Sequence, residues 1–416
     1  MIYIGLDLSD KFFDSCITDE SGDVLDRNRF DNSHDGFCSL VKLINEHCQE
    51  SRTQQQEHVT ECIIGLENPR SSIVDFLTQR GYSVVLTQPD AVYNYRKSRI
   101  PSGAKSDQAD AQLIADYVRE HHKTLRSITI ADESIRELSL LLEDRDRLVR
   151  QKVRFSNQLT STLKEYFPQA LEAFGSIDSK SAIQYLKAID TYDQVKGTPR
   201  KKLEKLLSES GVKRKDSRER FHEAMKKPGY RVSPALVKTK VRLKNVLVTH
   251  LELLLNQIAD YEDQIREIMD NSTDGGLFRS LPGADYILGG KLLVLYSTRD
   301  FHQASEAQQL FGTVPYTAMS GQSRRVSFRR GANKFGRNTF QQLARGSILS
   351  CNWASIQYAK KRNQGKKSHH AFRCLANTWV KITFAMWRDK KPYNESTILA
   401  AIASHIINQP AFVNRD

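Results

Sequence analysis

The sequence predicts an α/β domain, then a long helical region, and finally a mainly helical C-terminal domain. Three observations predict this order. Apolar side chains alternate with polar or small ones near the start, and strand-like and helical segments then alternate up to residue 87. Further along, two long runs with helical spacing of apolar residues contain neither glycine nor proline. The first two patterns are typical of a mixed sheet covered by helices, and the third is typical of long amphipathic helices.

The first segment is predicted to be a three-strand meander. Ile2, Ile4 and Leu6 alternate with polar or small residues, so Asp7 falls on the opposite face at the end of the strand. Residues 12–18 and 24–30 flank a turn-rich stretch and are expected to form a hairpin. The sheet is completed by a helix over 37–47, a strand over 59–67 that ends in Glu67, a helix over 71–80 and a strand over 82–87.

A helix with two acids on its inner face is predicted to follow. Ser106 is its expected N-cap, and Asp107, Asp110 and Ile114 share one stripe at about 3.6 residues per turn. Both carboxylates are therefore expected to face the protein.

The two long apolar-periodic runs cover residues 135–167 and 236–269. They predict either an antiparallel helical stalk, which could also pair between subunits, or two ordinary helices of a bundle. The segment between them, 179–234, is helical in pattern, polar and basic, and is either a nucleic-acid clamp or a solvated face. The expected boundaries are 1–130 for the α/β domain, 131–272 for the helical region with its insert, 273–392 for the C-terminal domain and 393–416 for a tail.

The charge distribution indicates a polyanionic partner. The formal net charge is +13 and the pI is about 9.3. Residues 307–388 contain fifteen Lys and Arg side chains and no Asp or Glu. Such a stretch repels itself unless an anion neutralises it, and DNA or RNA phosphate is the usual candidate. The alternative is a solvated basic surface, although solvated faces normally carry both signs.

Other classes of protein are not indicated. The six cysteines include no Cys-x-x-Cys pair, which argues against a zinc ribbon or a dithiol redox motif. No run approaches the roughly 18 apolar residues of a membrane span, so we expect no membrane association and a cytoplasmic location.

Four acids are the candidate metal ligands: Asp7, Glu67, Asp107 and Asp110. Carboxylates that meet at the end of a sheet repel one another, and a divalent cation is the ordinary way to satisfy them. Ligands that are all oxygen suit Mg²⁺ or Mn²⁺. Each acid alone has an ordinary alternative, because acids are common at strand ends and Asp107 or Asp110 could complement the helix dipole.

Several motifs resemble one known family. GLDLSDK around Asp7, GLEN around Glu67 and KSDQADA around Asp107 and Asp110 resemble the DEDD tetrad of the insertion-sequence transposases of the "one-ten" family, also called bridge recombinases. LPGADYILGGKLL, FGTVPYTAMSGQSRR and RRGANKFGRNTFQQLA resemble the second, transposase domain of that family. The resemblance runs from Met1 to about Lys390. It implies a RuvC-like, RNase H-type fold for the N-terminal domain and a coiled-coil stalk in the helical region.

The resemblance also implies a mechanism. The nucleophile of the family lies in a Ser-Gly step, which corresponds to Ser320 and Gly321. Ser320 would attack a DNA phosphate, with help from the metal site, and leave a phosphoserine. Active sites shared between subunits imply a dimer or tetramer, and a noncoding guide RNA would pair with donor and target DNA. The side chains expected to hold phosphates are Arg324, Arg325, Arg329, Arg330, Lys334 and Arg337, and the basic insert is expected to hold RNA.

Two other functions remain open on the sequence. One is a RuvC-like nuclease or junction resolvase in which water attacks and Ser320 is only a turn residue before glycine. The other is a nucleic-acid-binding protein without catalysis.

Overall fold

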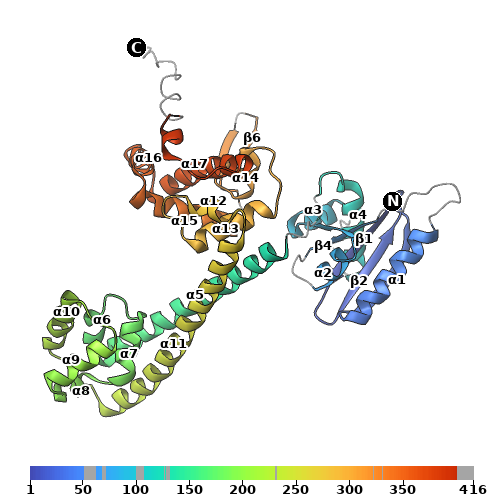
Figure 1. Ribbon diagram of the computed structural model, residues 1–416. Coiled ribbons are helices and arrows are strands. Elements are labelled where there is room, and N and C mark those ends of the chain that lie inside the picture. Colours follow the sequence, from blue (N-terminus) through green and yellow to red (C-terminus); the bar gives the residue numbers. More distant parts are fainter. Residues whose placement is uncertain are drawn as a thin grey trace. The chain divides into compact units, whose positions relative to one another are not determined.

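The computed structural model describes residues 1–50, 62–67, 72–99, 107–125, 127, 132–229, 232–321, 323–329 and 331–400, with the backbone alone for 49, 50 and 107. The chain folds into two compact units, Met1–Ala131 and Asp132–Asp416 (Figure 1). No helix in the described part of the chain is long and apolar enough to cross a membrane.

The first unit contains a five-stranded mixed sheet with the strand order β3-β2-β1-β4-β5. β1 pairs antiparallel with β2 and parallel with β4, and β5 continues the parallel half. This arrangement is consistent with the expected RNase H-type fold. The strands are β1 (Ile2–Leu8), β2 (Phe12–Thr18), β3 (Val24–Asp31), β4 (Cys62–Leu66) and β5 (Ser83–Leu86).

Helices cover both faces of this sheet. One face packs Ile4, Leu6 and Phe13 against α1 (His34–Glu50) and α2 (Ser72–Thr78). The other face, to which Tyr3, Gly5 and Asp7 belong by strand alternation, is covered by α4 (Asp107–His121). α3 (Pro89–Arg99) packs against α4.

α4 runs antiparallel to β1. Near the start of β1, the Tyr3 hydroxyl lies 3.5 Å from Nδ1 of His122, just beyond the last residue of α4. Further along, a Cβ on Gly5 would lie 2.0 Å from the carbonyl oxygen of Ala111 and 2.4 Å from the amide nitrogen of Ala115. Only glycine fits there, because the helix backbone rests directly on the strand. The first turn of α4 therefore lies above the carboxyl end of β1.

The second unit contains a pair of long helices, α5 (Glu133–Tyr166) and α11 (Pro234–Asn271), which lie side by side (Figure 1). Three contacts along the pair join Arg145 to Glu262, Phe155 to His250 and Glu165 to Lys240. The number of the contacted residue in α11 falls as the residue number in α5 rises, so the two helices are antiparallel, which is the first of the two arrangements that the sequence left open.

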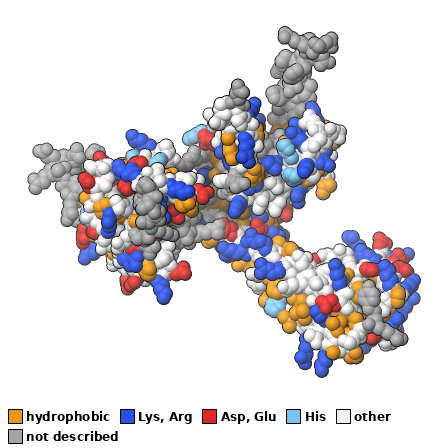
Figure 2. Space-filling model, turned by 180° about the vertical axis from the view of Figure 1, so that it is seen from behind, with side chains coloured by type: hydrophobic (Ala, Val, Ile, Leu, Met, Phe, Trp, Pro, Cys, Tyr) orange, Lys and Arg blue, Asp and Glu red, His pale blue; other side chains and the backbone are white. Residues whose placement is uncertain are grey.

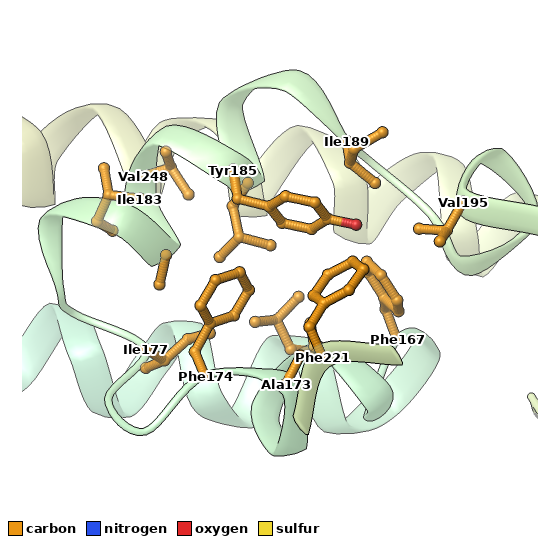
Figure 3. Close-up of a cluster of buried hydrophobic side chains, with 14 of the residues drawn as sticks. Phe167, Ala173, Phe174, Ile177, Ile183, Tyr185, Ile189, Val195, Phe221 and Val248 are labelled. Atoms are coloured by element: carbon orange, nitrogen blue, oxygen red, sulfur yellow. The ribbon is translucent and has the colours of Figure 1, made fainter. Parts of the chain in front are cut away.

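Five short helices lie between α5 and α11 in the described residues, and they share one core with the facing parts of these two long helices. Figure 3 shows the rings of Phe174, Tyr185 and Phe221 turned towards one another, with centroids 5.3 Å apart for Phe174 and Tyr185 and 5.1 Å apart for Tyr185 and Phe221. In Figure 2 the surface of this insert carries Lys and Arg side chains with Asp and Glu scattered among them. The helices are α6 (Gln169–Ala173), α7 (Lys180–Ala188), α8 (Tyr192–Gly197), α9 (Arg200–Glu209) and α10 (Lys215–Lys226).

The C-terminal part is mainly helical as far as it is described, and it contains a β-hairpin. Its core is built on large aromatic residues, whose polar atoms are satisfied inside it. The fully buried Tyr296 hydroxyl lies 2.9 Å from Oγ1 of Thr383, and Trp379 Nε1 donates to Ser347 Oγ at 2.9 Å. The elements are α12 (Gly275–Arg279), α13 (Tyr286–Ser297), α14 (Ala304–Leu310), β6 (Tyr316–Ser320), β7 (Ser323–Ser327), α15 (Lys334–Ser350), α16 (Asn352–Asn363) and α17 (Ser368–Asp389).

The predicted mixed sheet and the long helices that follow it are confirmed. The structure adds two elements that the sequence analysis did not predict, α3 and the β6–β7 hairpin. The expected N-cap Ser106 lies outside the described residues. The finer domain boundaries within the second unit remain a prediction.

Candidate active site

Asp7 and Glu67 are neighbours at the carboxyl ends of two parallel strands. Leu6 of β1 is in register with Leu66 of β4, and each acid is the next residue of its chain. Adjacent strands are about 4.8 Å apart, so the two backbones are close at this point. Strand alternation puts Asp7 on the face that α4 covers. Asp7 is half-buried and Glu67 is exposed.

Asp110 lies on α4 and is 9% exposed. Its carboxylate forms an ion pair with the guanidinium of Arg96, which reaches across from α3. Asp110 Oδ1 nevertheless accepts no well-directed hydrogen bond. Asp107 is the first residue of α4, one turn before Asp110, and its side chain lies outside the described part of the structure. A buried carboxylate needs a positive partner, and Arg96 fills that role here.

The described side chains among the candidate ligands, those of Asp7, Glu67 and Asp110, come from one edge of the sheet but are not gathered around one point. The first turn of α4 is above the end of β1, and its positive dipole end favours carboxylates at this edge. Among the side chains that the structure describes, no three acids, cysteines or histidines come close enough to share a metal ion. The oxygen-only donors still fit Mg²⁺ or Mn²⁺, but Arg96 pairs with Oδ1 of Asp110 here, so a metal ion at that oxygen would have to displace the guanidinium.

Asp14 is an acid near this edge that sequence reasoning missed. It lies directly opposite Asp7 in the β1–β2 pair and is 1% exposed. The Arg29 guanidinium donates to both of its carboxylate oxygens, at 3.1 and 2.8 Å. This bidentate pairing neutralises Asp14, so a structural role explains it fully.

Ser320 is the last residue of β6 and is exposed next to a tight turn. It lies directly opposite Ser323 in the antiparallel hairpin, and Gly321 follows it with φ +55°. A positive φ at this point suits glycine and is typical of two-residue hairpin turns. The hydroxyl of Ser320 is therefore held near the tip of a hairpin, where a large substrate can reach it.

The two arginines of β7, Arg324 and Arg325, lie on opposite faces of the hairpin. Residues that lie opposite each other share a face, and faces alternate along each strand. Arg325 lies opposite Ala318, so it shares the face of Ser320, whereas Arg324 lies opposite Met319 on the other face. Diagonal neighbours on one face are about 7 Å apart, within reach of a long side chain. Arg325 is therefore the arginine of the hairpin that can approach a group at Ser320.

The remaining predicted cations lie beyond the hairpin. Arg337 donates to the carbonyl oxygen of Arg329 at 3.0 Å and lies 4.2 Å from the ring of Phe328. Burial first, and then the charge of Arg373, lower the pKa of Arg337. Lys334 is the exposed first residue of α15, and Arg330 lies outside the described residues. In the described part of the chain, none of the predicted phosphate-binding cations forms an ion pair with an acid of the protein.

Comparisons with known proteins agree on one class. Residues 4–168 match a transposase model of the DEDD, IS110 type, and residues 275–360 match a model described as the transposase IS116/IS110/IS902 family. The IS117 mini-circle protein of Streptomyces coelicolor is 24% identical over 91% of this chain and 92% of its own. The 44.8 kDa protein of insertion element IS116 from Streptomyces clavuligerus is 23% identical over 94% of this chain and 95% of its own. The transposase for insertion sequence element IS1111A of Coxiella burnetii is 24% identical over 76% of this chain and 70% of its own.

An acid-bearing mixed-sheet domain of the DEDD type, followed in one chain by a basic transposase domain, defines a transposase. The chain belongs to the IS110 family of transposases.

Proposed function

We propose that this transposase cuts and rejoins DNA with Ser320 as the nucleophile, assisted by Mg²⁺ or Mn²⁺ bound at Asp7, Glu67, Asp107 and Asp110. The observation that carries the proposal is the exposure of Ser320 beside the hairpin turn, with Arg325 on the same face. The adjacent carboxyl ends of β1 and β4 support the second half of the proposal.

The reaction is a transesterification. Ser320 Oγ forms a bond to phosphorus while the phosphorus–oxygen bond to one strand breaks, and the departing oxygen takes up a proton. The phosphoserine ester keeps the phosphate at the diester level, so a hydroxyl of a new strand can displace the serine without another energy source. Arg325 would hold the non-bridging oxygens of the phosphate during both steps.

A serine hydroxyl is a weak nucleophile at neutral pH. A divalent cation held by the four carboxylates would supply positive charge that favours the alkoxide and offsets the charge of the phosphate. Asp7 and Asp110 are the better placed ligands, because both are withdrawn from solvent at the edge where the first turn of α4 meets the sheet.

The proposed function also implies nucleic-acid partners and a second copy of the chain. We propose that a noncoding guide RNA selects donor and target DNA, and that a homodimer or tetramer shares its active sites between subunits. The antiparallel α5–α11 pair is a candidate subunit contact, because Leu253 and Val246 of α11 are exposed. Nucleic acid would also be contacted by five cations of the C-terminal part, Arg324, Arg329, Arg330, Lys334 and Arg337. The backbone of Gly321 would contact it as well.

Trapping a covalent adduct tests the proposal. Transposase incubated with labelled element-end DNA and Mg²⁺ should give an adduct that survives denaturing electrophoresis, and Ser320→Ala should abolish it. Ser323→Ala is the matched control, because this serine lies directly opposite in the same hairpin. A water nucleophile leaves no adduct, so cleavage that persists in Ser320→Ala would establish the nuclease alternative. DNA binding without any cleavage in the wild type would establish the non-catalytic alternative.

Mixing two inactive variants tests the shared active site. In a dimer of Asp7→Asn and Ser320→Ala chains, one site has both defects and the other has none if acids and serine come from different subunits. About a quarter of all sites should then recover activity in a random mixture of dimers. If each chain completes its own site, no mixture regains activity.

A further inference from the structure

A cavity of about 470 Å³ lies at the base of the β6–β7 hairpin. Its walls come from the two ends of the hairpin, represented by Pro315 and Phe328, and from α16 and α17. Three basic side chains line it, Lys361 on α16 and His370 and Arg373 on α17. None of them belongs to the motifs that the sequence analysis singled out for phosphate contact.

No carboxylate balances these cations. Residues 307–388 contain no acid, and in the described part of the chain Lys361 and Arg373 form no ion pair. Arg373 Nε is buried without a hydrogen-bond partner. Burial first, and then the charges of Lys366, Arg373, His369 and Lys361, lower the pKa of His370. Unpaired positive charge around a cavity is costly, and an anion would relieve it.

The remaining polar groups of the cavity offer donors. Asn377 uses its Oδ1 to accept from Thr313 Oγ1 at 2.8 Å, which leaves its Nδ2 hydrogens for a ligand. Arg373 also lies 4.9 Å from the ring of Phe328, and Arg337 lies 4.2 Å from the same ring. Both guanidinium groups therefore compete with a base for stacking on this ring. The cavity therefore suits a phosphate better than a nucleobase.

We propose that this cavity binds one backbone phosphate of the DNA strand that Ser320 attacks. The inference rests on the proposed function, because it takes Ser320 as the reference point of the strand. Ser327 borders the cavity and follows Ser323 by four residues along β7, about 14 Å at 3.4 Å per residue. Stacked nucleotides advance about 3.4 Å each. The bound phosphate is therefore within about four nucleotides of the one that Ser320 attacks, and it sets the register of the strand on the hairpin.

The first test measures binding of full-length transposase to labelled single-stranded DNA by fluorescence anisotropy over a range of salt concentrations. Lys361→Gln/Arg373→Gln should bind roughly tenfold more weakly and lower the salt slope by about 0.7 per lost phosphate contact. Lys360→Gln/Lys381→Gln is the matched control, because it removes two exposed charges from the same helices outside the cavity. Equal weakening by the two double variants, or by neither, would overturn the proposal.

A milder variant distinguishes loss of phosphate binding from misfolding. Arg373 packs on Phe328, whereas the side chain of Lys361 bonds, among the described residues, to the exposed Gln364 alone, at 3.4 Å. Lys361→Gln should therefore leave the melting temperature unchanged and still weaken binding. RNA of the same sequence is the second arm. An effect confined to RNA would overturn the assignment to the cut strand.

Single neutral linkages locate the phosphate. Each phosphodiester of element-end DNA is replaced in turn by a methylphosphonate, and one position within about four nucleotides of the cut should weaken binding. In the double variant Lys361→Gln/Arg373→Gln, a methylphosphonate at that position should no longer weaken DNA binding. This measurement needs no catalysis, so phosphate binding in the cavity can be confirmed even if Ser320→Ala still cleaves DNA. The proposal is contradicted if each methylphosphonate weakens binding by the double variant as much as binding by the wild type.

Discussion

Gly5 of β1 lies directly beneath the backbone of Ala111 on α4, so close that a Cβ at position 5 would be 2.0 Å from the Ala111 carbonyl oxygen. This contact fixes the height of α4 above the sheet. It thereby brings Asp107 and Asp110 over the strand that carries Asp7.

Gly5→Ala should therefore destabilise the first unit. The helix must move away from the strand, because backbone atoms cannot yield as a flexible side chain can, and we expect a loss of about 3 kcal/mol in the free energy of unfolding. Urea denaturation measures it. Gly197→Ala is the control, because no atom lies within 4 Å of a Cβ there. Equal stability of Gly5→Ala and wild type would contradict the close packing of α4.

Arg96→Gln tests the link between Asp110 and a cation. Removal of Arg96 leaves the carboxylate of Asp110 buried without a positive partner, which should cost about 3 kcal/mol in EDTA. Mg²⁺ should restore most of this loss if Asp110 is a ligand. Arg99→Gln breaks a more exposed pair with Glu120 and should cost less than about 1 kcal/mol in either buffer. Thermal unfolding with and without Mg²⁺ distinguishes the cases, and an Arg96→Gln loss that Mg²⁺ leaves untouched would argue against metal binding by Asp110.

The two faces of the hairpin predict unequal roles for two adjacent arginines. Arg325→Gln should reduce the rate of adduct formation by about a hundredfold, because a charge-assisted hydrogen bond to the attacked phosphate is lost. Arg324→Gln should weaken DNA binding several-fold and change the rate at saturating DNA much less. Single-turnover kinetics separate binding from rate. Equal rate losses in the two variants would contradict the face assignment.

Lys244 predicts a pH dependence of stability in the insert. Its side chain is fully buried, and its ammonium donates to the carbonyl oxygen of Leu186 and, at 2.7 Å, to Asp190 Oδ1. Burial lowers the pKa of Lys244. The unfolded chain then binds this proton more tightly, so the contribution of Lys244 to the free energy of unfolding rises with pH from the lowered pKa up to the ordinary value of 10.5.

Lys244→Met should remove that rise, which is at most about 1.4 kcal/mol per pH unit. It should also lower stability at pH 7 by about 2 kcal/mol, because the carbonyl oxygen of Leu186 loses its donor. Urea denaturation of both proteins between pH 7 and pH 10 gives the difference in their free energies of unfolding. The contribution of the tyrosines to the pH dependence cancels in this difference, because they titrate in both proteins. Parallel curves for the two proteins would show that Lys244 keeps its ordinary pKa.

Much of the first unit could be predicted because its signals are local. Alternation in residues 2–6 and the apolar strand that comes just before Glu67 are enough to place two acids at strand ends. Their adjacency follows once β1 and β4 pair in parallel. α3 was missed because among its described residues only Val92 is buried, so it has little apolar periodicity.

Long-range pairs carry no such signal. The ion pair between Arg96 and Asp110 depends on how α3 packs on α4, which spacing along the chain does not encode. The hairpin was missed because its strands are almost entirely exposed and so lack a buried face, although Ser320-Gly321 is a turn dipeptide. The basic cavity joins residues from both sides of that hairpin and from two helices, and only the absence of acids in 307–388 hinted at it.

The rate of covalent adduct formation in Asp7→Asn tests the central claim most directly, because that claim joins the acids of the first unit to the serine of the second in one reaction. With Mg²⁺ and saturating element-end DNA, Asp7→Asn should form adduct at least about a hundredfold more slowly than wild type and bind DNA equally well. Asp10→Asn, which alters an exposed acid three residues further on, should react like wild type. Adduct that forms on Ser320 as fast in Asp7→Asn as in wild type would contradict the account.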